Sequence, residues 1–396
     1  MKPKRKRSPR FAGGRERVEE VILCLLFILH LKLSYVKIIN MLAALKSQDW
    51  KLNASVLILI FIGLLSLFSA KPELFWKQLL FLCMGLFLFF LIAKIEWRPF
   101  INNRGAVLGI YFFIIILLLI TYFFAPPIRG VRAWLPLGPF QFQASEFSKI
   151  VLIIIFANFF RKKHVSIARV SNIFISFFYF AAPAFLVLIQ PDLGSVLILF
   201  SIWFGFLLVS GIKWSHLLIS FLIFAAVGIF MWSSILKDYQ KERILGVFLP
   251  NQDPLGINYN VIQSKIAIGS AGFFGKGFGQ GTQTQLGFLP EAQTDFIFAA
   301  AVEEFGFLAG LVIILAFGYL IFRIVIIGMH TDNNFGRFAC LGTAIFLTVQ
   351  FALNIGSNLG ITPVIGVPFP FLSYGGSSLL TSFIIIGIIQ SIKIKK

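Results

Sequence analysis

The feature that most constrains this chain is a series of long apolar runs, several of which approach the length of a membrane-spanning helix. Tyr111–Phe124 and Phe174–Ile189 are examples in which polar residues are almost absent. A helix needs about 20 apolar residues to cross the hydrocarbon core, and it makes all its backbone hydrogen bonds internally. Strands of a membrane barrel instead alternate apolar and polar residues. The runs therefore predict an all-α, polytopic integral membrane protein.

The composition excludes a soluble fold. Of the 396 residues, 58% are hydrophobic and only 13% are charged, whereas soluble domains carry about 25% charged residues. The 35 Lys and Arg outnumber the 16 Asp and Glu and give a net charge of +19. In a membrane protein such an excess flanks the spans and sets their orientation, so we favour this interpretation over nucleic-acid binding.

About ten transmembrane helices are expected, and basic residues concentrate in every second connection. If the basic N-terminal tail is cytoplasmic, the positive-inside rule places both termini in the cytoplasm. This orientation also places a large extracytoplasmic loop, residues 237–295, between the seventh and eighth spans. The expected spans are Leu52–Ala70, Gln78–Ala93, Ala106–Phe124, Phe147–Phe160, Ile173–Ile189, Leu193–Ser210, Leu217–Leu236, Phe296–Ile321, Phe338–Ile355 and Ser378–Ile392.

We divide the chain into a basic cytoplasmic N-terminal extension, residues 1–48, and a transmembrane domain, residues 49–396. Within the extension, Val21–Leu42 fits a signal segment, an interfacial helix or an extra span. The large loop 237–295 is rich in Gly, Pro, Gln and Asn but also contains apolar pieces, which is atypical of a linker. We expect short helices there, lying at the outer membrane face around a cavity.

The scarce carboxylates are the first candidates for chemistry. Asp295 stands where the outer loop enters an apolar span, and partial removal from water there favours a carboxyl that acts as a general base. Thr294 is expected to cap this helix, which would leave Asp295 for another task. Glu146 and Lys149, three residues apart on one helix, form either a structural ion pair or a substrate contact. Asp192 either caps the next helix or has a functional role.

Cations in the outer loop are candidates for holding a phosphate. Arg243, Lys265 and Lys276 lie in this loop, and glycines surround the last two. Backbone N–H groups of glycine-rich turns can approach phosphates closely. No P-loop motif occurs in the sequence, and flexibility is the commoner reason for such glycines. The pattern therefore indicates an anion site only weakly.

Several motifs together resemble the signatures of the SEDS family (shape, elongation, division and sporulation proteins). The resemblance extends from about Asp49 to the C-terminus. Arg243-Ile244, Ala267–Ser270 and Gly281–Thr284 are more similar to the RodA-like branch of the family. The motifs are Phe288–Ala299, Glu303-Glu304-Phe-Gly306, Gln190-Pro-Asp-Leu-Gly194, Asn258-Tyr-Asn260 with Gln263-Ser264, Gly275-Lys-Gly277, Gly281-Thr-Gln283 and Ser373-Tyr-Gly-Gly-Ser-Ser378.

This resemblance implies a peptidoglycan glycosyltransferase that polymerises lipid II at the outer face of the bacterial cytoplasmic membrane during cell elongation. It implies ten transmembrane helices with a large extracytoplasmic loop between the seventh and eighth. The implied partners are lipid II, the undecaprenyl-pyrophosphate-linked glycan and a class B penicillin-binding protein. The family's essential acid matches Asp295, and its other sensitive positions match Glu146, Lys149 and Asp192.

The implied reaction requires a base near the acceptor hydroxyl and positive charge near the pyrophosphate. We assign the first role to Asp295 and the second to Arg243, Lys265 and Lys276. A divalent cation held by Asp295 is an alternative that the sequence does not separate from a base. The rival functions are a lipid II flippase and a non-catalytic scaffold of the elongation machinery. A flippase needs polar residues along its whole route, whereas here they concentrate on the outer side.

Overall fold

The structure, a computed structural model, describes residues 47–128, 130–138, 140–163, 170–211, 214–236, 238–249, 256 and 258–395. The expected N-terminal extension, including Val21–Leu42, therefore lies outside the described residues except for Ser47 and Gln48. The elements described below belong to one unit, which starts at Asp49.

All ten expected spans occur as helices. Among the described residues, seven of these helices are long and apolar enough to cross a membrane, and α8 is a shorter apolar helix. The prediction of an all-α, polytopic membrane fold is confirmed. The ten helices are α2 (Trp50–Ala70), α3 (Pro72–Ala93), α5 (Arg104–Phe124), α6 (Ala144–Lys163), α7 (Val170–Ile189), α8 (Leu193–Val209), α9 (Trp214–Phe230), α13 (Ile297–Met329), α14 (Asn334–Leu359) and α15 (Gly376–Ile394).

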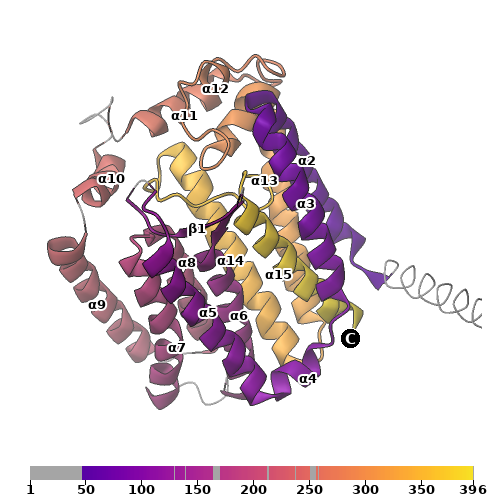
Figure 1. Cartoon of the computed structure of the whole chain (residues 1–396), viewed down its shortest axis with the longest axis vertical. Helices are drawn as coiled ribbons and strands as arrows, with labels where there is room; N and C mark the ends of the chain where they lie inside the picture. The colour runs from indigo at the N-terminus through magenta and orange to yellow at the C-terminus, as the bar shows by residue number, and fades with distance from the viewer. Residues whose placement is uncertain are drawn as a thin grey trace, which may run out of the picture. The chain divides into compact units, whose positions relative to one another are not determined.

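Short helices lie between α9 and α13, as expected for the large outer loop. They are α10 (Asp238–Phe248), α11 (Tyr259–Ser270) and α12 (Thr282–Gln285), and a π-helical turn (Met231–Ile235) extends α9. α11 packs on α13 and α14 at one end of the helix bundle, and α4 (Trp97–Asn102) lies at the other end (Figure 1).

A small sheet is not predicted by the sequence. β1 (Trp134–Leu137) and β2 (Phe140–Gln143) pair antiparallel, with Trp134 opposite Gln143. Each strand has four residues, too few for an alternation of apolar and polar residues to be recognised. The backbone N–H of Gln143 donates to the Ser377 hydroxyl (2.9 Å), so the hairpin connects the segment before α6 to the start of α15.

Glycines allow close approach between helices that are distant in sequence. α3 packs along α15, α2 along α13, and α14 contacts α6, α8 and α13. A side chain at Gly85 of α3 would overlap the Phe383 ring of α15, and one at Gly387 of α15 would lie 3.1 Å from the Phe89 carbonyl oxygen. Small residues at such positions let membrane helices approach closely enough for van der Waals packing, which drives their association in lipid.

α13 is not one continuous helix. A straight helix of its 33 residues would be about 50 Å long, well beyond the ~30 Å of the hydrocarbon core. The backbone leaves the helical region at Gly306, where φ is 83° and ψ is 178°. The break divides α13 into a short first part, residues 297–305, and a longer second part, residues 307–329.

The loop before α12 fills this break with its own backbone. The N–H groups of residues 276 and 277 donate to the carbonyls of Glu303 and Glu304 (2.9 and 3.0 Å). The N–H groups of Phe307 and Leu308 donate to the carbonyls of residues 272 and 273 (3.1 and 3.2 Å). These bonds satisfy groups that a helix break would otherwise leave unpaired in a membrane. We call Gly272–Gly277 the inserted segment; two of its N–H groups are thus used inside the protein rather than offered to a phosphate.

A group of polar bonds joins the start of α2 to the far ends of α13 and α15. Asp49, the N-cap of α2, accepts the N–H of Leu52 (3.0 Å) and pairs with Arg323 of α13. Gln390 of α15 accepts the Asp49 N–H (2.9 Å) and donates to its carbonyl (3.2 Å). Burial alone would raise the pKa of Asp49, but the hydrogen bonds from Arg323 and from the Leu52 N–H outweigh it, so this pKa lies below its ordinary value.

We expect Asp49→Asn to lower the free energy of unfolding by about 1–3 kcal/mol at neutral pH, because Arg323 loses its charged partner while the cap is kept. A carboxyl whose pKa is lowered by folding stabilises the protein above its unfolded pKa, about 4, and this contribution is lost as the pH falls through the folded value. The difference in melting temperature between wild type and variant should therefore shrink below about pH 4. Glu73→Gln, at an exposed acid in the first turn of α3, is the control; it breaks no ion pair among the described residues and should lower the melting temperature much less than Asp49→Asn. A difference that does not change with pH would contradict the ion-pair explanation.

Candidate functional site

Asp295 lies where the outer loop enters α13. It is partly buried and precedes Ile297, the first helical residue, by two positions. In the turn before it, Glu291 adopts a left-handed φ of 55°, and its carbonyl accepts the N–H groups of Thr294 (3.1 Å) and Phe296 (3.2 Å). The N-terminal end of a helix attracts an anion because its first N–H groups have no partner within the helix. Asp295 therefore occupies a position that favours a carboxylate.

Thr294 does not cap α13, so that expectation was wrong. Its hydroxyl donates to the Glu291 carboxylate (3.1 Å), and the N-cap residue, Phe296, makes no side-chain cap bond. The cap comes from another helix, since the Asn358 side-chain oxygen accepts the N–H of Ala299 (3.1 Å). A capping partner from a distant part of the chain is not visible in the local sequence.

Two amides of α14 hold the backbone of Asp295. The side-chain nitrogens of Asn354 and Asn358 donate to the Asp295 carbonyl (3.0 and 2.9 Å), and both side chains are fully buried. Asn354 also donates to the carbonyl of Val367 (2.8 Å), in the α14–α15 loop (residues 360–375). The sequence analysis missed this pair; its signal is two asparagines four residues apart, on one face of an apolar span.

The α14–α15 loop gathers three of the predicted residues. A side chain at Gly366 would lie 3.9 Å from the Asp295 Oδ2 atom. The carbonyl of Val364 accepts an N–H of Arg243 from α10 (3.2 Å). Lys265 of α11 lies over the first residue of the loop, where a side chain would come within 2.6 Å of its Nζ atom. One carboxylate and two cations thus lie around one short stretch of backbone.

Asp192 borders the same loop and has a structural task. Its Oδ1 atom accepts the Ser195 N–H (3.0 Å) and caps α8, and its Oδ2 atom accepts the Ser145 hydroxyl (3.0 Å). A side chain at Gly194 would come within 2.7 Å of the Ile365 carbonyl oxygen. The capping interpretation of Asp192 is confirmed, and its bonds tie the start of α6 to the start of α8, where Gly194 lies against the loop.

Glu146 and Lys149 form a buried ion pair near the start of α6. Their Oε1 and Nζ atoms are 2.6 Å apart, and the side chains of Glu146 and Lys149 are only 3% and 1% exposed. The Lys149 ammonium also lies 5.8 Å from the centre of the Phe346 ring of α14, within the range of a cation–π contact. The other carboxylate oxygen of Glu146 has no hydrogen-bond partner among the described residues.

Lys276 pairs with a different acid, about two turns along α13 from Asp295. Its Nζ atom lies 3.1 Å from the Glu303 carboxylate and donates to the Thr282 hydroxyl (2.7 Å). Glu303 is wholly buried and also accepts the N–H groups of Gln283 (2.8 Å) and Thr284 (3.1 Å). The structure thus uses Lys276 to anchor α12 at the break in α13.

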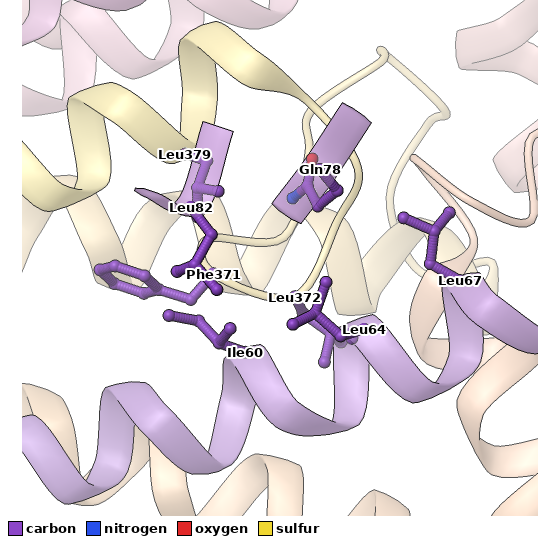
Figure 2. A pocket seen from close by; sticks show the side chains of 9 residues that line it. Ile60, Leu64, Leu67, Gln78, Leu82, Phe371, Leu372 and Leu379 are labelled. Carbon is purple, nitrogen blue, oxygen red and sulfur yellow. The ribbon is translucent and has the colours of Figure 1, made fainter. Parts of the chain in front are cut away.

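A small apolar cavity of about 10 Å³, which is room for roughly one water molecule, lies between α2, α3, the α14–α15 loop and the start of α15 (Figure 2). Its one polar side chain, Gln78 of α3, donates to the Ser373 carbonyl (3.2 Å). The Ser373 hydroxyl in turn donates to the Thr294 carbonyl (2.6 Å), next to Asp295. The lining residues are Ile60, Gly63, Leu64, Leu67, Gln78, Leu82, Phe371, Leu372 and Leu379.

A protein-only metal centre has no support in the part of the chain that the structure describes, where no three His, Cys, Asp or Glu side chains gather. A divalent ion at Asp295 would take its other ligands from water, backbone carbonyls or a substrate. Mg²⁺ is commonly held in this way, by one or two carboxylates together with substrate phosphates.

Asn358→Leu should disturb the Asp295 turn without touching its carboxylate. The variant leaves the Ala299 N–H without its acceptor and removes one of the two amide donors to Asp295, at a cost of about 1–3 kcal/mol for each unsatisfied buried group. We expect a lower melting temperature and a reduced turnover. Asn334→Ala, at an exposed position of the same helix, is the control and should change neither quantity. Wild-type turnover in a folded Asn358→Leu variant would contradict a positioning role.

The fold and the site together define a class of protein. It is a polytopic membrane protein in which a partly buried carboxylate and two cations lie around one loop at an end of the helix bundle. Such an arrangement suits a substrate with an anionic group, met at the membrane surface.

Comparison with known proteins identifies the family. Residues 50–396 match the model of the FtsW, RodA and SpoVE cell cycle proteins. The chain is 37% identical over 311 residues to peptidoglycan glycosyltransferase MrdB of Escherichia coli (strain K12), over 78% of this chain and 83% of MrdB.

Two of the solved structures that resemble this chain cover most of its length. One is a chain of a peptidoglycan synthase complex, with a TM-score of 0.76, 32% identity, and coverage of 87% of this chain and 97% of that chain. The other is the rod shape determining protein RodA of Thermus thermophilus, with a TM-score of 0.66, 28% identity, and coverage of 87% and 96%. The chain belongs to the FtsW/RodA/SpoVE family, and the resemblance to SEDS proteins is confirmed.

Proposed function

We propose that this protein polymerises lipid II into glycan strands at the outer face of the bacterial cytoplasmic membrane, with Asp295 as the catalytic carboxylate. The chain is a peptidoglycan glycosyltransferase, the activity named for its relative MrdB. The observation that supports the role of Asp295 is its position at the start of α13, where two buried amides hold its backbone. A base held in this way stays aligned with the hydroxyl that it deprotonates.

In the proposed reaction, an acceptor hydroxyl oxygen attacks the anomeric carbon of the donor. A new C–O bond forms, the bond from that carbon to the pyrophosphate oxygen breaks, and undecaprenyl pyrophosphate leaves with the electron pair. Asp295 takes the hydroxyl proton. Arg243 of α10 and Lys265 of α11, which both lie against the α14–α15 loop, stabilise the charge that develops on the pyrophosphate. Lys276 contributes indirectly, by anchoring α12 through Glu303.

We place the Asp295 end of the bundle outside and both termini in the cytoplasm. Basic residues cluster at the opposite end, where α6 finishes with Arg161–Lys163 and α15 carries Lys393 in its last turn. The similarity to RodA supports a role in cell elongation. The similarity to a synthase complex that coordinates polymerization and crosslinking supports a class B penicillin-binding protein as partner.

Incubation of the purified protein with labelled lipid II, with and without a class B penicillin-binding protein, tests this function. We expect ladders of glycan products on gels. Transbilayer movement of lipid II without ladders would instead support a flippase. The absence of both activities from the folded protein, with its partner present, would support a scaffold.

A further inference from the structure

The inserted segment carries two of the most exposed apolar side chains at the Asp295 end of the molecule. Phe273 and Phe274 are 61% and 77% exposed, and Phe278, just beyond the segment, is 50% exposed. Three neighbouring phenyl rings expose a large apolar area, which is unfavourable in water and indicates an interaction surface.

This aromatic surface continues the apolar faces of two membrane helices. Phe278 stacks on Phe68 in the last turn of α2, with ring centres 6.2 Å apart. The carbonyl of Phe273 accepts the N–H of Leu308 at the start of the second part of α13, where Phe307 and Leu308 are 49% and 43% exposed. Phenyl rings in this position, at the ends of membrane spans, are suited to contact lipid rather than a soluble partner.

We propose that the inserted segment is a membrane anchor that sets the depth of Asp295. Phe273 and Phe274 enter the lipid leaflet on the Asp295 side and lie among acyl chains. The backbone bonds between the segment and α13 then hold Asp295 at a fixed depth relative to the leaflet. The proposal of a membrane anchor is based on the exposed rings alone. The proposal that the anchor sets the depth of Asp295 rests on the proposed function of this residue.

The inserted segment and the first part of α13 are packed so tightly that they should move together. The backbone at Gly275, where φ is 84°, crosses the backbone at Gly306 very closely. A side chain on Gly275 would overlap the backbone of α13, and one on Gly306 would overlap the backbone of the inserted segment. The ion pair between Lys276 and Glu303 (3.1 Å) adds a side-chain bond to the first part of α13. Because this part begins two residues after Asp295, a shift of the segment in the bilayer would carry the carboxylate with it.

A fixed depth matters for a lipid-linked substrate. Its tail holds the reacting sugar at a set height above the leaflet, and a catalytic group must match that height to within about 1 Å for full rate. An anchor bonded to the first part of α13, which begins two residues after Asp295, meets this requirement better than helix ends without such bonds.

Spin-label accessibility in vesicles tests the anchor independently of activity. Single cysteines are placed at residues 273, 274 and 280 after replacement of Cys24, Cys83 and Cys340, and the protein is reconstituted into phosphatidylethanolamine and phosphatidylglycerol. Labels at 273 and 274 should be more accessible to oxygen than to a water-soluble nickel complex. The label at Gln280, an exposed polar position of the same loop, should show the opposite order and serves as control. A water-like pattern at 273 and 274 would overturn the anchor, whatever the protein's activity.

Two glycine variants test the transmission to Asp295. Gly275 and Gly279 both have a left-handed φ (84° and 71°), so alanine strains both, but only at Gly275 would the side chain overlap α13. We expect Gly275→Ala to lower kcat at least tenfold with little change in KM, and Gly279→Ala to lower it much less. Equal kcat values in the two folded variants would overturn the proposal that the inserted segment positions Asp295. The proposal that the segment anchors in lipid would still be decided by the spin labels. If Gly275→Ala does not fold, the pair Phe273→Ser/Phe274→Ser replaces it, with the same expected loss of kcat.

Discussion

Asp295→Asn is expected to reduce the polymerisation of lipid II to a small residual rate while leaving the fold intact. The amide keeps the shape of the side chain. The side-chain amides of Asn354 and Asn358 donate to the backbone carbonyl of residue 295, so the substitution does not remove these bonds. Loss of a general base typically lowers a rate by about 10²–10⁴-fold. Initial rates of glycan formation measure the effect, and the melting temperature checks the fold.

Glu291→Gln is the matched control, because Glu291 is an acid in the same turn whose side chain bonds to Thr294. It should retain most of the activity. The residual rate of Asp295→Asn also distinguishes a base from a metal ligand: the Mg²⁺ concentration for half-maximal rate should be unchanged if Asp295 is a base and raised if it holds the ion. Polymerisation at the wild-type rate by Asp295→Asn would remove Asp295 from the mechanism altogether.

Lys149→Met is expected to have the largest effect on stability. The substitution leaves the Glu146 carboxylate buried without its cation, and breaking a buried ion pair from one side costs about 3–5 kcal/mol. We expect little folded protein in membranes. The double variant Glu146→Gln/Lys149→Met removes both charges, and replacement of a whole buried pair is often neutral or stabilising.

The double variant therefore separates structure from chemistry at this pair. Because neither side chain reaches the surface, we expect the double variant to regain both its melting temperature and most of its polymerisation rate. A folded double variant without activity would instead show that the two charges act on the substrate. That result would favour the prediction from the sequence that Glu146 and Lys149 bind substrate.

The helical architecture could be predicted because it depends on a simple physical quantity. A membrane helix needs a continuous apolar run, and the ten runs recognised in the sequence all became helices. Asp295 could be singled out as a candidate for a related reason, since carboxylates are rare in this chain and one at the start of an apolar span is costly without a role.

The details that position Asp295 could not be predicted, because they depend on contacts between distant residues. The break at Gly306 is filled by backbone from about thirty residues earlier, and a glycine in an apolar run does not by itself indicate a break. Asn358 caps α13 from 59 residues away. Lys276 and Glu303 are both in the sequence motifs, but their pairing requires the inserted segment to be in place.

The bonds around Asp49 have a consequence for the synthesis of the protein. Arg323 follows Asp49 by 274 residues, so at 5–20 residues per second roughly 14–55 s pass before the partner of this carboxylate leaves the ribosome. α3 similarly packs along α15, which follows it by more than 250 residues. The first two described spans must therefore remain in the membrane without their main neighbours until α13 and α15 have been synthesised. A chain that stops before α15 would keep the packing of α2 on α13 but would leave the face of α3 that packs along α15 uncovered, so we expect such truncated copies to be more open to proteolysis within α3.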